Sequence, residues 1–171
     1  MKSVKIVSKI LFYITRVLSI AYFFMASLSV LALTTGLGLG FYGDKKYFHV
    51  FYPFTKVPFL NGDYNMPYIV FYFLLPISLY GLFFLLVSNV FKVFFQPRLF
   101  TQYGIGRLKG FYLANLIIPG ATILLTSIFT EVDNAFVVFV ALHFILGIFA
   151  FFLAAIFKQG VHLQNQQDLI I

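Results

Sequence analysis

Charged residues divide the chain into four long apolar segments. No Lys, Arg, Asp or Glu occurs in residues 17–43, 64–91, 110–130 and 134–157. The shortest of these segments has 21 residues, and a helix of about 20 residues spans the roughly 30 Å hydrocarbon core of a bilayer. The pattern predicts an all-α, polytopic membrane protein, with four transmembrane helices packed in a bundle as a single membrane domain over residues 1–171.

Two of the expected spans are strongly apolar. Residues 68–91 and 134–157 are dense in Ile, Leu, Val and Phe, the residues that favour insertion most on the biological scale. Pro76 lies inside the first of these spans and should bend it, because proline removes a backbone donor and crowds the preceding turn. Both segments are therefore predicted to insert on their own apolar content.

The other two spans differ from these in their flanking sequence or in their composition. Residues 17–39 follow a basic segment that looks like a signal peptide, but the apolar run is too long for one, so we expect it to remain as the first helix. Residues 110–130 contain Asn115, Pro119 and a lower apolar content. The insertion of this third span should therefore depend on packing against the fourth span across the short turn 131–133.

Basic residues predict the orientation. Nine Lys and Arg lie in residues 1–16, in the connection 92–109 and in the tail 158–171, whereas the loop 41–67 contains three. An excess of Lys and Arg marks the cytoplasmic side, so we expect both termini in the cytoplasm of a multi-pass protein of the cell membrane. The net charge of +7 is explained by this flanking pattern, and no direct nucleic-acid binding is expected.

The connections are expected to lie at the membrane surfaces. The external loop 41–67 is rich in aromatic residues and proline, which suits an ordered cap in the headgroup zone, with a ligand-sensing cap as the alternative. Alternation through Tyr47–Phe54 allows a short strand there. The connection 92–109 mixes aromatic and cationic residues and should lie in the interface. The tail 158–171 should dock on the cytoplasmic ends of the helices.

The candidate intramembrane polar residues are His143 and Asn115. His143 is the one ionisable residue within the spans, and it shares a helical stripe with Gly147, Ala150 and Ala154. We expect it to be neutral and structural, bonded to Asn115 or to another polar residue across the seam between helices. A proton relay or a ligand site is the alternative.

Enzyme chemistry and bound cofactors are not expected. The chain has no cysteine, which removes disulfides and thiolate ligands. The three histidines, His49, His143 and His162, are predicted at different membrane levels and cannot share a metal ion. No Ser-His-Asp or His-Glu-x-x-His arrangement can be built. We therefore predict no catalytic residues, no metal site and no cofactor.

Two passages carry a family resemblance. The connection contains Phe100-Thr101 and Arg107-Leu108, and the terminus contains a glycine, a Leu-Gln pair and an Asp-Leu pair, at Gly160, Leu163, Gln164, Asp168 and Leu169. Together they resemble a bacterial membrane family of short four-span proteins, the domain of unknown function 2975 family. The chain departs from it where acids and a threonine are usual, at Asn165, Gln166, Gln167 and Ile170. The resemblance implies proteins encoded beside small helix-turn-helix regulators, and it implies no catalytic residues.

Two functions from different classes follow. The first is a non-enzymatic, regulatory membrane protein that binds a cytoplasmic helix-turn-helix transcription regulator. Its partner surface is predicted to combine the connection with a tail that folds back toward it, using Arg98, Phe100, Arg107, Gln164, Asp168 and Leu169. The alternative is a small oligomeric transporter, channel or ligand-binding membrane protein, with a site between the helices near His143 and Asn115.

Overall fold

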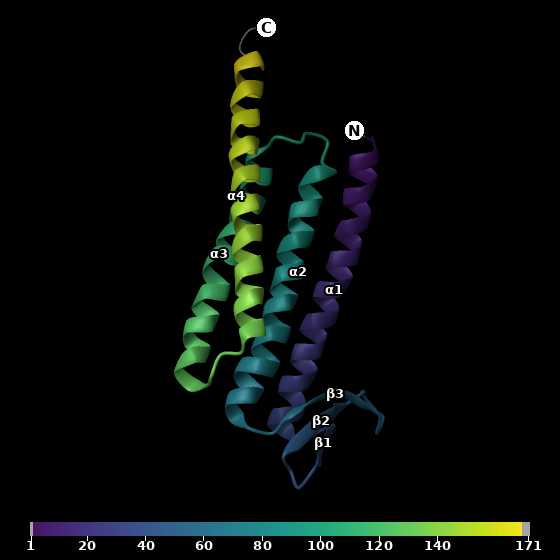
Figure 1. Ribbon diagram of the computed structural model, residues 1–171. Helices are drawn as coiled ribbons and strands as arrows, with labels where there is room; N and C mark the ends of the chain where they lie inside the picture. The colour runs from purple at the N-terminus through teal and green to yellow at the C-terminus, as the bar shows by residue number, and fades with distance from the viewer. Residues whose placement is uncertain (1, 169–171) are drawn as a thin grey trace. The chain divides into compact units, whose positions relative to one another are not determined.

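The described residues of the protein form four long helices and one small sheet (Figure 1). The computed structural model describes residues 2–168. Its elements in chain order are α1 (Lys2–Thr35), β1 (Leu39–Tyr42), β2 (Tyr47–Phe51), β3 (Pro58–Asp63), η1 (Tyr68–Leu74), α2 (Leu75–Phe94), α3 (Gln102–Phe129) and α4 (Asn134–Asp168).

Four helical segments are long and apolar enough to cross a membrane, as predicted for a multi-pass membrane protein. They are Lys2–Thr35, Tyr68–Phe94, Gln102–Phe129 and Asn134–Gln167. Each of the four extends past its charge-free run at one end, because a helix continues wherever no breaker stops it and Lys, Arg and Gln are good helix formers. The basic amino-terminal segment is therefore helical, and the tail continues α4 as far as Asp168.

The all-α prediction is wrong for the loop between the first two spans. This loop forms an antiparallel sheet in the order β1-β2-β3, in which His49 pairs with Gly40 on one side and Asn61 on the other. The predicted strand at Tyr47–Phe54 is confirmed as β2, over Tyr47–Phe51. Phe48 and Val50 are buried on one face of β2, while the alternate residues Tyr47, His49 and Phe51 lie on the other, as expected for an aromatic and β-branched strand over a core.

The chain divides into two compact units, and the sheet belongs to the unit Val17–Phe84. The core of this unit consists of Ala32 from α1, Phe48 and Val50 from β2, and Ile69 and Phe73 from η1. The inner face of the sheet therefore packs directly on the ends of α1 and η1.

A change of helix type precedes Pro76. Residues Tyr68–Leu74 form the π-helix η1, and the N–H of Leu75 donates to the carbonyl of Val70, five residues back. Proline has no N–H, and its ring crowds the carbonyl four residues earlier. The wider π spacing, which is common at such irregularities, relieves this crowding. The predicted bend at Pro76 stays a prediction, and the structure shows a π-helical segment directly before this proline.

The second unit comprises the remaining described residues, which include α3, α4 and the first turns of α1. Helices α3 and α4 form a hairpin across the predicted turn at residues 131–133. The stripe predicted on α4 is confirmed in its small residues, because Gly147, Ala150 and Ala154 are all buried. A Cβ at Gly147 would lie 3.3 Å from the carbonyl oxygen of Tyr112 on α3. Small side chains therefore let the two backbones approach closely.

Candidate docking surface at the basic end

The α2–α3 connection is a short, fixed segment because α3 begins earlier than expected. Thr101 caps the helix: its backbone is extended, and its Oγ1 accepts a hydrogen bond of 3.1 Å from the N–H of Gly104. A threonine at this position satisfies one of the backbone donors that the first turn of a helix leaves free. Thr101 thus defines where the connection ends.

Phe100 fastens the connection to α4. Its ring lies edge-on to the ring of Phe157, with the centroids 5.2 Å apart. A Cβ added at Gly160 would lie 2.5 Å from Cγ and Cδ1 of Phe100, closer than carbon atoms can approach without displacement. The Phe100 ring therefore packs directly on the backbone of Gly160, one helical turn beyond Phe157.

A small apolar core packs against this contact. Val93 from α2, Leu108 from α3, and Ala154 and Phe157 from α4 are buried together, and Phe100 packs against them. The rings of Phe94 and Phe157 meet edge-on at 5.7 Å. The end of α2, the connection, the first turns of α3 and the end of the apolar part of α4 are therefore held as one packed group.

Three of the polar residues predicted for partner binding face solvent. Arg98, Arg107 and Gln164 are exposed, and the guanidinium of Arg107 lies over the Tyr103 ring at 4.8 Å from its centroid. Such a stacked cation keeps its hydrogen-bond donors available while its side chain is held in place. Phe100 differs from these residues, because its ring is partly buried and packs against the apolar core.

The predicted fold-back of the tail is wrong. Residues 158–168 continue α4 (Figure 1), and a helix rises 1.5 Å per residue, so the chain moves away from the connection after Gly160. The tail is helical because nothing between Lys158 and Gln167 breaks a helix except Gly160, which is held by packing. Asp168 is the last residue of α4 that the structure describes, and Leu169 lies outside the described residues.

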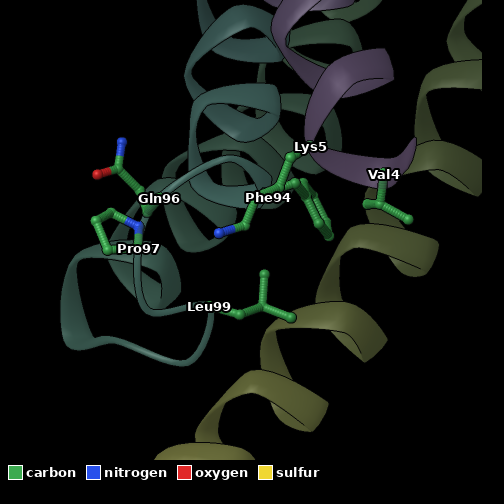
Figure 2. A pocket seen from close by; sticks show the side chains of 6 residues that line it. All are labelled: Val4, Lys5, Phe94, Gln96, Pro97 and Leu99. Atoms are coloured by element: carbon green, nitrogen blue, oxygen red, sulfur yellow. The ribbon is translucent and has the colours of Figure 1, made fainter. Parts of the chain in front are cut away.

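A small hollow lies next to the connection (Figure 2). It encloses about 180 Å³ and is lined by Val4 and Lys5 of α1 and by Phe94, Gln96, Pro97 and Leu99. Figure 2 shows the Lys5 side chain extending across the hollow toward the connection. The lining is mostly apolar, so the hollow suits an apolar group placed beside a cation.

The intramembrane candidates are bonded within their own helices. Nδ1 of His143 lies 2.8 Å from the carbonyl oxygen of Phe139, and Nδ2 of Asn115 donates to the carbonyl oxygen of Phe111 at 2.8 Å. Asn115 is 3% exposed, and its Oδ1 has no hydrogen-bond partner within residues 2–168. The predicted hydrogen bond between helices at His143 stays a prediction.

Sequence reasoning missed Gly160 and Phe157 as parts of the surface. A glycine just beyond an apolar span normally indicates the end of a helix, and a phenylalanine at the end of a span is normally expected to face lipid. A partial signal was spacing, since Gly160 follows Phe157 by three residues and the two therefore lie on the same side of α4.

Comparisons of the chain with protein-family models, with curated proteins and with solved structures find no match. The resemblance to the domain of unknown function 2975 family therefore stays a prediction.

Proposed function

We propose that this chain is a non-enzymatic, regulatory protein of the cell membrane, with both termini in the cytoplasm, whose α2–α3 connection and final α4 turns bind a soluble cytoplasmic protein. The family resemblance makes a small helix-turn-helix transcription regulator the expected partner. The observation that carries the proposal is the seating of Phe100 on Gly160, because it joins two segments distant in sequence into one defined surface.

The composition of this surface supports a protein partner. Its exposed groups include the cations Arg98 and Arg107, the latter held over an aromatic ring. Beyond them α4 presents an exposed helical stretch through residues 162–167, rich in amide side chains. Arginines and amides on a fixed backbone supply specific hydrogen bonds, and exposed charges steer association more than they stabilise a fold.

The experiment disrupts the contact between Phe100 and Gly160 and leaves the exposed polar side chains of the surface unchanged. In Gly160→Leu the new side chain would occupy the place of the Phe100 ring and displace the connection from α4. The matched control is Gly110→Leu, because a Cβ at Gly110 meets nothing within 4 Å. Each tagged variant is expressed in its host, its membrane-fraction yield is measured, and co-purified proteins are identified by mass spectrometry.

We expect a helix-turn-helix regulator to be recovered with the wild type and with Gly110→Leu, and to be lost with Gly160→Leu at unchanged membrane yield. Truncation after Gly160 should likewise abolish recovery if the last α4 turns contact the partner. Equal recovery from Gly160→Leu, or recovery of no such regulator with the wild type, would overturn the proposal.

A second candidate function is a small oligomeric transporter, channel or ligand-binding membrane protein, and Asn115 favours it. Its Oδ1 is buried without a partner among the described residues, as is Oγ1 of Thr126 on the same helix. Pro119 also removes the N–H that would bond the Asn115 carbonyl. Buried oxygen atoms of this kind would be satisfied by a polar ligand that donates hydrogen bonds to them. Ion or proton flux into vesicles that is lost in Asn115→Leu would support this function, and absence of flux in the wild type would reject transport.

A further inference from the structure

The turn between β2 and β3 has a defined shape. The N–H of Tyr52 donates to the carbonyl of Val57 at 3.0 Å, and the N–H of Thr55 donates to the carbonyl of Tyr52 at 3.1 Å. The Thr55 hydroxyl donates to the carbonyl of Tyr52 and accepts from the N–H of Val57. Backbone and side-chain bonds therefore close the turn on both sides and fix its tip.

Phe54 occupies a costly position at this tip. Its φ is +62°, in the left-handed region that glycine adopts freely and that a bulky residue rarely adopts. With Pro53 before it, the third turn position is one where glycine or asparagine is normally found. The Phe54 ring gains nothing from packing, because its exposed fraction is 107%. Neither the local backbone nor the core of the unit explains a phenylalanine here.

The residues around Phe54 form an apolar tip with one cation. Tyr52 is 47% exposed and Val57 is 57% exposed. Lys56 lies between Phe54 and Val57, and residues 52–58 contain no acid. An aromatic ring, a tyrosine hydroxyl, an aliphatic side chain and a lysine are the groups that favour the boundary between lipid headgroups and acyl chains.

The sheet is tied to two helices that are long and apolar enough to cross a membrane. Both ends of the sheet join the apolar helices α1 and η1 through segments of a few residues, and its inner face packs on the ends of those helices. Figure 1 shows the sheet lying across the ends of α1 and η1 and extending sideways past α1. A sheet that is tied to the ends of membrane-crossing helices and extends sideways would lie over the lipid that surrounds them.

We propose that the β2–β3 turn is a membrane anchor, which inserts Phe54 and Val57 into the headgroup–acyl boundary of the adjacent leaflet and places Lys56 near lipid phosphates. The partner is the bilayer itself. The cost of the left-handed Phe54 backbone is then offset by transfer of its ring from water into lipid. The anchor would fix the orientation of the sheet relative to the membrane plane. This inference is independent of the proposed cytoplasmic partner.

The absence of tryptophan from the chain makes the test direct. In Phe54→Trp the new residue is the sole tryptophan, and the protein is reconstituted into vesicles of phosphatidylcholine and phosphatidylglycerol with brominated acyl chains. We expect a blue-shifted emission and several-fold stronger quenching than for Tyr47→Trp. Tyr47 is a suitable control because it is 41% exposed and lies on the outer face of the sheet, opposite the core.

A second pair of variants keeps the test valid if Phe54→Trp folds poorly. Val57→Trp should also be quenched by brominated lipid, and this quenching should fall when Phe54→Gly is added, because the anchor is lost while the turn becomes easier to form. Water-like emission at both positions would overturn the proposal. A blue shift without quenching by brominated lipid would overturn it as well, since it would mean that protein covers the tip.

Discussion

The close approach of α3 and α4 at Gly147 gives a quantitative prediction. A Cβ at this position would lie 2.9 Å from both Cγ and Cδ2 of Leu116, and 3.3 Å from the carbonyl oxygen of Tyr112. Nonbonded carbon atoms prefer separations of about 3.5–4.0 Å. Leu116 can change rotamer, but the backbone oxygen cannot move without moving α3. Gly147→Leu must therefore push the two helices apart.

The expected cost follows from overpacking. Inserting carbon atoms into a well-packed site typically costs about 1–3 kcal/mol. Gly147→Leu adds a whole side chain where even a methyl group is crowded, and separating the helices also loosens the buried contact at Ala150. We expect a loss of about 2–3 kcal/mol in the free energy of unfolding, in the upper part of that range.

The assay is unfolding in mixed micelles, with helicity followed by circular dichroism as the SDS fraction rises. Ala155→Leu is the control, because Ala155 is exposed on α4 and should change stability by no more than about 0.5 kcal/mol. Equal unfolding midpoints for the two variants would refute the reasoning, since the α3–α4 contact would then not depend on a small residue at Gly147.

Two further predictions concern orientation and the intramembrane histidine. In the cysteine-free chain, a cysteine at the exposed position Asn61 should be labelled by an impermeant reagent in intact cells, and one at the exposed position Gln102 should not; the reverse pattern would invert the proposed topology. His143→Gln should change unfolding stability by less than about 1 kcal/mol, because an amide can replace the hydrogen bond to the Phe139 carbonyl. Loss of a measurable activity in this variant at normal yield would instead assign His143 a functional role.

The sequence alone determined the number of long helices and the buried stripe on α4. Both are properties of consecutive residues, since apolar length decides whether a helix can span a membrane and helical periodicity places Gly147, Ala150 and Ala154 on one face. The intervening strand at Tyr47–Phe51 was also visible as alternation, because strand residues point to opposite faces in turn.

Only the tertiary structure decided the sheet and the docking surface. A three-stranded sheet requires pairing between separate segments, such as Leu39 with Val50 and Tyr47 with Asp63, and alternation in one strand does not specify its partners. The packing of Phe100 on Gly160 brings together residues far apart in the chain. The left-handed backbone of Phe54 depends on the turn that encloses it. Local propensity and hydropathy act along the chain, whereas these features arise from contacts across it, and a sequence pattern alone does not encode which distant surfaces fit together.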